Sequence, residues 1–321
     1  MTELVCGLVT LDDEGRLAQA RAVASAVPIK YLWDNPDEQP IIADDAAFQD
    51  WIDERIRFFD ALRRKGYCFY PWLINREVPK KWRRSDIVVW NQGAIPSCGS
   101  TATAHALEYH TLISIAEGNP VEYTAFNPMY SHYGATGGWT NQGVTMFQSG
   151  ELLNLTGAFS VEDVGSDNRS TPRDYSEKKP DAGKFKAAIC YIGDNSPDMW
   201  FRLSRACVPL AFGSAQFYAS SEKDRNGMAA AGRVTTGGHA ECAAGCWTEA
   251  NGEEYIYIQN SHGDIYGTDS TGKPESGYWV TKRQCELFCS TCERYGTPFV
   301  PLPRCLRQDD ASFAMELKLK G

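Results

Sequence analysis

The chain has 321 residues, of which 43% are hydrophobic and 23% charged, a balance that is typical of a folded globular protein and excludes a mainly disordered chain. Its 41 acidic and 32 basic residues give a net charge of -9, which argues against a surface built to collect nucleic-acid phosphates or anionic lipid. We therefore expect a folded protein that has neither a nucleic acid nor a membrane as its partner.

Residues 1 to about 77 combine a helical pattern with proline-containing connections. Apolar residues recur at helical spacing over 48–62, and prolines follow Asn35 and Gln39. The chain starts without a basic leader, and no window approaches the apolar length of a membrane span. We predict an N-terminal extension over 1–77, a main domain over 78–321 and a cytoplasmic location.

The eleven cysteines are an odd number, so at least one thiol is free. In a chain without a secretory signal, we expect most of them to be buried thiols. One group near the C-terminus contains a C-x-x-C pair and could bind zinc, but no second close pair accompanies it. Its members are Cys285, Cys289, Cys292 and Cys305. We therefore predict no metal site.

A turn-rich segment at 90–100 carries Cys98 to the start of a helix predicted over 100–116. Small and apolar residues recur there at three- and four-residue spacings, and Gly118-Asn119-Pro120 ends the pattern. A thiol at a helix N-terminus lies at the positive end of the backbone dipole, where the thiolate is favoured. Cys98 is therefore a candidate nucleophile.

The middle of the chain has weak patterns, and the last third favours strands. Residues 165–184 are rich in Ser, Asp, Lys and Pro, which predicts an exposed loop. Short β-favouring runs at 208–212, 255–258 and 277–281 are bounded by Gly and Pro. A helical first half followed by a strand-rich second half predicts an α+β fold.

A thiolate that attacks a carbonyl needs a base, a group that orients the base, and donors for the oxyanion. His239 opens the strand-rich half, and Asn260 follows 21 residues later, directly after an alternating run. Two antiparallel strands joined by a hairpin would bring these side chains together. Gln92, six residues before Cys98, has an amide that can reach the same place. Each also has a structural interpretation, as a core histidine or as a residue that stabilises a turn.

The residues around these candidates resemble the motifs of the papain-like cysteine peptidases, which have the same order of Cys, His and Asn. The similar segments are 91–93 (oxyanion glutamine), 98–100 (nucleophile), 238–240 (histidine) and 259–263 (asparagine), with weaker similarities at 78–82, 137–139 and 277–279. The resemblance covers about residues 78 to 300.

The resemblance implies a two-lobed α+β fold and the chemistry of a thiol peptidase. A helical lobe over about 90–185 would carry the nucleophile, and a β-rich lobe over about 186–300 would carry the histidine and the asparagine. A peptide or protein would be the substrate, and no cofactor is needed. The implied catalytic residues are Cys98, His239, Asn260 and Gln92, and the implied substrate-binding residues are Gly137, Gly138, Trp139 and Gly238.

Some positions depart from the family pattern. Ile95 and Ala135 stand where members from oxidising compartments have a cysteine, which agrees with a reducing compartment. His262 replaces the tryptophan that in the family shields the hydrogen bond between Asn and His.

Two alternatives to a peptidase stay open. One is a structural or binding component of a larger assembly, such as a phage particle or other virion, with little turnover. The other is a related amide chemistry, such as peptidoglycan cleavage. The N-terminal extension is interpreted either as a propeptide-like cover of the cleft or as a permanent layer that docks onto such an assembly.

Overall fold

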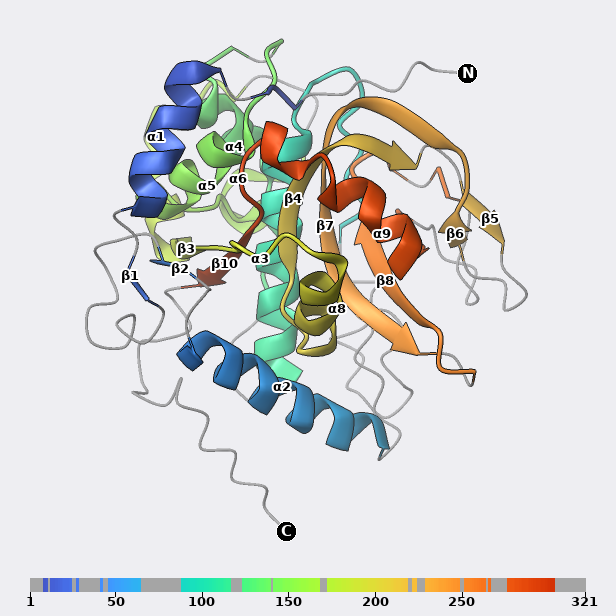
Figure 1. Cartoon of the computed structure of the whole chain (residues 1–321). Helices are drawn as coiled ribbons and strands as arrows, with labels where there is room; N and C mark the ends of the chain where they lie inside the picture. Colours follow the sequence, from blue (N-terminus) through green and yellow to red (C-terminus); the bar gives the residue numbers. More distant parts are fainter. Residues whose placement is uncertain are drawn as a thin grey trace.

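The computed structural model arranges helices and strands around one long central helix (Figure 1). The described residues are 8–10, 12–24, 27–28, 41–42, 46–64, 88–116, 123–139, 141–167, 172–218, 221–223, 229–248, 251–263, 265–266 and 276–303. The weakly similar segment at 78–82 and Cys305 lie outside them.

The helices fall into an N-terminal pair, a central group and a C-terminal pair. They are α1 (Asp13–Ala24), α2 (Ala46–Arg64), α3 (Cys98–Ala116), α4 (Pro128–Ala135), α5 (Met146–Leu155), α6 (Val161–Val164), α7 (Tyr175–Ala182), α8 (Pro197–Arg205) and α9 (Lys282–Cys289), with 3-10 turns η4 (Gly183–Phe185) and η5 (Cys292–Arg294). No helix within the described ranges is long and apolar enough to cross a bilayer.

The strands form one sheet in the order β1-β2-β3-β10-β4-β7-β8-β9-β6-β5. They are β1 (Val27–Pro28), β2 (Ile41–Ile42), β3 (Ala187–Tyr191), β4 (Leu210–Tyr218), β5 (Ser221–Lys223), β6 (Ala229–Ala231), β7 (Val234–Thr248), β8 (Glu254–Gln259), β9 (Gly277–Thr281) and β10 (Phe299–Pro303). The four strands β4, β7, β8 and β9 pair antiparallel in that order. This antiparallel part is the framework of the β-rich lobe.

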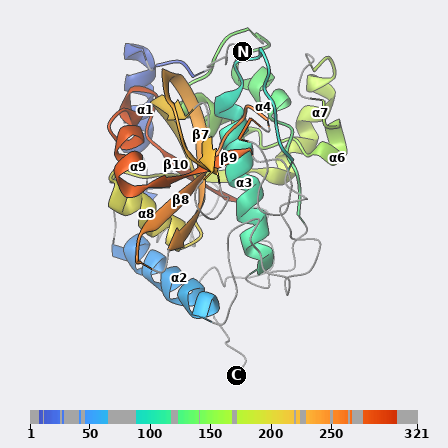
Figure 2. The same cartoon turned by 90° about the vertical axis from the view of Figure 1, so that its right-hand side faces the viewer.

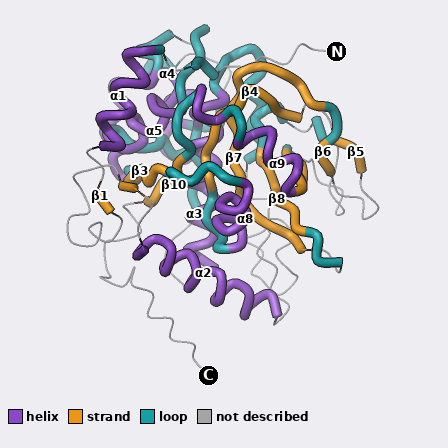
Figure 3. Tube along the Cα trace, in the orientation of Figure 1, coloured by secondary structure: helices purple, strands orange, loops and turns teal. Residues whose placement is uncertain are grey.

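Helices cover the sheet on both faces, and successive side chains along a strand therefore belong to two different buried clusters. Along β3, Ile189 and Tyr191 join the cluster of α3, whereas Ala188 and Cys190 join the cluster of α2, α8 and α9. Figure 2 shows α3 running along the sheet on the side away from α8 and α9. In Figure 3, α1, α4 and α5 gather on the side opposite β5, β6 and β8, which gives the molecule its two lobes.

Helix α2 packs against α8 as part of the main core. Its residues Trp51 and Ile52 are buried in the cluster that also holds α8. Asp53 pairs with Arg202 at 2.6 Å and Asp60 with Arg205 at 2.9 Å, both across the same contact. The pattern predicted over 48–62 is therefore part of a 19-residue helix whose apolar side is covered by the β-rich lobe.

Two sequence expectations differ in detail from the structure. The central helix begins at Cys98, two residues before the predicted start, because the Thr101 N–H already donates to Ser97 O at 3.0 Å. The polar segment 165–184, predicted as a loop, contains α7 and η4. Its polar composition hides the helix, since α7 buries only Ala182 fully.

Candidate active site

Cys98 lies at the N-terminus of α3, where the helix meets the β-rich lobe. Its side chain is fully buried, and it belongs to the same apolar cluster as Ala240 and Cys242 of β7. The N–H groups of the first helical turn lack partners within the helix and favour a negative charge on the sulfur. The fold therefore brings the predicted nucleophile against β7, the strand that carries His239.

The hairpin of β7 and β8 brings His239 and Asn260 together, in the way that the spacing predicts. Cys242 pairs with Gln259 in the antiparallel register, so His239 and Asn260 lie at the same end of the hairpin. His239 Nε2 lies 2.8 Å from Asn260 Oδ1, and both side chains are fully buried. Asn260 is thereby placed to hold the imidazole ring.

The other ring nitrogen of His239 is left for chemistry. Nδ1 is buried and makes no hydrogen bond within the described part of the chain. Burial, together with the neighbouring His262, lowers the pKa of His239 well below its usual range, and the hydrogen bond with Asn260 partly opposes this shift. The ring is therefore neutral at neutral pH and can accept a proton at Nδ1.

Two aromatic rings pack against His239. His262 stacks on His239 with ring centroids 4.6 Å apart and an interplanar angle of 11°. Phe217 packs against His239 at 4.5 Å and against His262 at 5.8 Å. His262 thus lies where the sequence comparison expected a shielding side chain, and Phe217 was not found from the sequence because it sits on the neighbouring strand β4.

The segment before Cys98 is tied to the segment after Asn260. Gln92 N–H donates to Ser261 O at 2.9 Å, and Gly263 N–H donates to Trp90 O at 3.0 Å. The Ser261 hydroxyl also donates to Gln92 Oε1. These bonds connect the nucleophile loop to the residues next to His239 and Asn260.

Gln92 has a buried side chain, and its amide nitrogen donates to Ile95 O at 3.1 Å. It therefore stabilises the turn that leads to Cys98. The assignment of its amide to an oxyanion site stays a prediction.

The residues Gly137, Gly138 and Trp139 form the turn that ends α4. Gly138 N–H donates to Tyr133 O at 2.8 Å, the two glycines have positive φ, and Trp139 is 62% exposed. This backbone hydrogen bond closes the turn at the end of α4. The assignment of these residues to substrate binding stays a prediction.

Leu8 lies between the neighbour of Cys98 and the neighbour of His239. Its N–H donates to Gly238 O at 3.1 Å, and a Cβ added to Gly99 would lie 3.7 Å from Leu8 Cδ1. A Cβ on Gly213 would come within 2.2 Å of Leu8 Cδ2, so only glycine leaves room there. Gly238 is a residue predicted to bind substrate, and its carbonyl accepts a hydrogen bond from the protein's own N-terminal segment.

Val144 is the second anchor of this segment, and the sequence did not reveal it. Val9 N–H donates to Val144 O at 3.0 Å, and Leu8 forms a parallel bridge with Val144. Leu8 itself is only 8% exposed. Motifs near Cys98 and His239 give no signal for a contact made from so far upstream.

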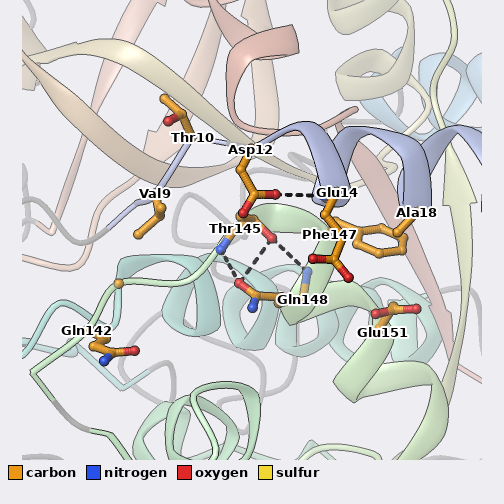
Figure 4. Close-up of a pocket in the computed structure, with 12 residues that line it drawn as sticks. Val9, Thr10, Asp12, Glu14, Ala18, Gln142, Thr145, Phe147, Gln148 and Glu151 are labelled. Carbon is orange, nitrogen blue, oxygen red and sulfur yellow. Dashed lines mark hydrogen bonds between the residues drawn. The ribbon is translucent and has the colours of Figure 1, made fainter.

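A cavity of about 550 Å³ borders the same N-terminal segment (Figure 4). Val9 and Thr10 line one side, and Thr145, Phe147 and Gln148 of α5 and its cap line the other. Asp12, Glu14 and Glu151 also face it, so its charge is negative. Open space thus remains next to Val9 and Thr10.

The cysteine group near the C-terminus packs around α9. Cys285 and Cys289 have their sulfurs 3.9 Å apart, and Cys292 Sγ donates to Phe288 O at 3.1 Å. Burial raises the pKa of the Cys285 and Cys292 thiols well above their usual value. Within the described residues, no group of His, Cys, Asp or Glu could hold a metal ion.

Comparisons with known proteins bear on the fold. No protein-family model matches the chain, and no curated protein matches it. Xylellain, a cysteine protease from Xylella fastidiosa, matches with a TM-score of 0.46 and 14% identity over 67% of this chain and 82% of its own. Bromelain from Ananas comosus matches with a TM-score of 0.46 and 18% identity over 70% of this chain and 99% of its own. Digestive procathepsin L 3 of Tenebrio molitor matches with a TM-score of 0.46 and 14% identity over 79% of this chain and 90% of its own.

The chain resembles the papain-like cysteine proteases. The expected two-lobed α+β fold is present, with Cys98 on the central helix and His239 and Asn260 on the β-rich lobe. At these identities and TM-scores the papain-like resemblance concerns the fold and carries no argument about activity. The activity has to be argued from the side chains of the site.

Proposed function

We propose that this protein is a cysteine peptidase that cleaves peptide bonds through an acyl-enzyme on Cys98. The observation that carries the proposal is the 2.8 Å contact from His239 Nε2 to Asn260 Oδ1, which leaves a buried Nδ1 able to accept a proton. The position of Cys98 at the N-terminus of α3 supports a nucleophilic role for its thiol.

In this reaction His239 takes up a proton and gives it back twice, once in each half. Nδ1 of His239 takes the proton of Cys98 as the sulfur attacks the carbonyl carbon of the substrate. The C–N bond then breaks, the leaving amine receives this proton, and a thioester stays on Cys98. A water molecule attacks the thioester while His239 accepts its proton, and the carboxylic acid leaves as the thiol is restored. Asn260 holds the ring through both halves.

The oxyanion that forms on the carbonyl oxygen needs donors. We assign this role to the backbone N–H of Cys98 and to the amide of Gln92, a donor of this kind contributing about 3 kcal/mol to transition-state stabilisation. Gln92 can serve if its second amide hydrogen points toward the substrate while the first stays on Ile95 O. No step of this chemistry draws on a cofactor.

The N-terminal extension is proposed to have two separate roles. Helix α2 is a permanent layer, since its buried residues share a core with α8. The segment at Leu8 and Val9 is a cover, since it occupies the carbonyls of Gly238 and Val144 between the two lobes. This combines both interpretations of residues 1–77, with the domain at 78–321 carrying the catalytic groups.

A peptide or protein chain in an extended form is the proposed substrate. The N–H groups of Leu8 and Val9 already show how backbone donors meet the carbonyls of Gly238 and Val144. The described cysteines are free thiols, in keeping with a reducing, cytoplasmic location. A virion or other assembly remains an alternative location, with the exposed face of α2 as the docking layer.

Hydrolysis of a mixture of peptides, followed by mass spectrometry, tests the proposal. Wild-type protein, Cys98→Ala and the control Cys289→Ala are compared, because Cys289 is a partly exposed thiol away from the site. We expect cleavage by the wild type and by Cys289→Ala and none by Cys98→Ala. Cleavage by Cys98→Ala at the wild-type rate would contradict the proposal. If neither the wild type nor Leu8→Asp, which should displace the segment at Leu8, cleaves any peptide, the alternative of a structural component with little turnover is favoured.

A further inference from the structure

We propose that Tyr266 is a positioning residue that sets the tautomer of His239 through Asn260. The use made of the ring rests on the peptidase function proposed above, whereas the tautomer itself can be measured without any activity. No motif in the sequence pointed to this tyrosine.

The hydrogen-bond chain starts at a group that can only accept. The backbone carbonyl of Tyr218 receives the hydroxyl of Tyr266 at 2.7 Å. A phenol has a single proton, so this bond uses the only one that Tyr266 has. At its other contact the Tyr266 oxygen must therefore accept.

That other contact is the side-chain amide of Asn260. Nδ2 of Asn260 donates to the Tyr266 oxygen at 2.6 Å. At the opposite end, Oδ1 accepts the backbone N–H of Ser261 at 2.6 Å. A reversed amide would set Oδ1 against a phenol oxygen without a proton and NH2 against an N–H donor, so both contacts fix the same orientation.

The orientation of Asn260 decides which nitrogen of His239 carries the proton. Oδ1 lies 2.8 Å from Nε2 and can only accept, so Nε2 must be protonated. In the neutral ring Nδ1 then keeps its lone pair, which is the form that a base needs. The carbonyl of Tyr218, linked to His239 by three hydrogen bonds in series, thus selects the reactive tautomer of the ring.

The side chains that set the tautomer of His239 are buried. His239, Asn260 and Ser261 are each at most 1% exposed and Tyr266 is 2% exposed, so bulk water does not compete for their hydrogen bonds. The backbone of Tyr218 is also held on the other side of its Cα, since its N–H donates to the Tyr278 hydroxyl at 3.4 Å and Tyr278 donates to Glu241 at 2.7 Å.

The test is the ¹⁵N NMR spectrum of the histidine side chains in the wild type and in Tyr266→Phe. His239→Gln identifies the His239 signals. Tyr130→Phe is the control, because it also removes a hydrogen-bonded hydroxyl, which donates to Asp174 at 2.6 Å in a different cluster. Activity is measured on the same samples, with titration of the reactive thiol to count folded sites.

We expect the wild type and Tyr130→Phe to show His239 protonated at Nε2 alone, and Tyr266→Phe to show a mixture of both tautomers. In the active protein, kcat of Tyr266→Phe should fall about tenfold with KM within twofold, as for loss of a group that orients a functional side chain. Asn260→Asp has two acceptor oxygens, so in that background Tyr266→Phe should leave the tautomer unchanged.

Wild-type His239 protonated at Nδ1 would overturn the proposal, and this readout holds even if Tyr266→Phe fails to fold. An unchanged tautomer in a folded Tyr266→Phe would overturn it as well. A wild type with the expected tautomer but without peptide cleavage would instead contradict the peptidase function and leave the role of Tyr266 standing.

Discussion

His262 is the side chain through which the surroundings of His239 depart most from the expected motif. Its ring stacks on His239 at 4.6 Å, so it shields the ring as an aromatic residue would, but it can also carry a charge. That charge is one of the two causes that lower the pKa of His239, the larger being burial. The residue therefore combines a ring contact with an electrostatic effect on His239.

His262→Phe should raise the pKa of His239 relative to the wild type. Phenylalanine keeps a flat ring over His239 and removes the positive charge that opposes its protonation. The measurement is an NMR titration of His239 in both proteins. A pKa that stays equal or falls would show that the charge of His262 does not act on His239.

Single residues were predictable from the sequence only where a local pattern marked them. Cys98 follows a turn-rich segment and opens a helix, and His239 and Asn260 flank a hairpin of readable length. Tyr266 and Leu8 carry no such mark. The role of each depends on where a loop or a distant strand ends in space, which spacing along the chain does not encode.

Among the elements, strand β7 carries a buried carboxyl group two residues after His239. Burial raises the pKa of Glu241 to about 8, against the hydrogen bond from Tyr278, which lowers it. Its Oε2 has no hydrogen-bond partner within the described residues. The folded protein therefore holds Glu241 protonated where the unfolded chain would ionise it.

Glu241→Gln should stabilise the protein at alkaline pH and not at acidic pH. Between pH 4.5 and 8 the folded wild type binds one proton more than the unfolded chain, so its stability falls by about 1.4 kcal/mol for each pH unit. Glutamine cannot ionise and removes this slope. Urea unfolding at pH 5 and pH 8 measures it, with Glu253→Gln, an exposed position, as the control.

If Glu241→Gln and the wild type lost stability equally between pH 5 and pH 8, Glu241 would be ionised in the folded state. The elements around it were largely predictable, because β8 and β9 are short runs of β-favouring residues. The short helices α6 and α7 were not, since their polar residues give no apolar stripe and tertiary contacts decide their conformation.

For the whole molecule, the main question is how the N-terminal extension and the rest of the chain depend on each other. Ile52 of α2 is fully buried in the core of the β-rich lobe, whereas Leu8 lies at the junction of the lobes. The two parts should therefore respond differently to substitution.

Ile52→Ala should lower the free energy of unfolding by about 3 kcal/mol, because it leaves a cavity in a shared core. Leu8→Asp should instead release the cover, since an unpaired carboxylate is costly to bury. We expect Cys98 to react with iodoacetamide about tenfold faster in Leu8→Asp, with Leu17→Asp, at a 52% exposed position, as the control. An unchanged rate would show that Leu8 does not restrict access.

The central claim is that His239 activates Cys98, and the rate of alkylation tests it most directly. Full-length Leu8→Asp is treated with iodoacetamide near neutral pH, with and without His239→Ala, and each cysteine is followed by mass spectrometry. The account predicts that Cys98 is modified well before the partly exposed Cys289 and that His239→Ala slows only Cys98, by roughly tenfold or more. Equal rates at Cys98 and Cys289, or no effect of His239→Ala, would contradict it.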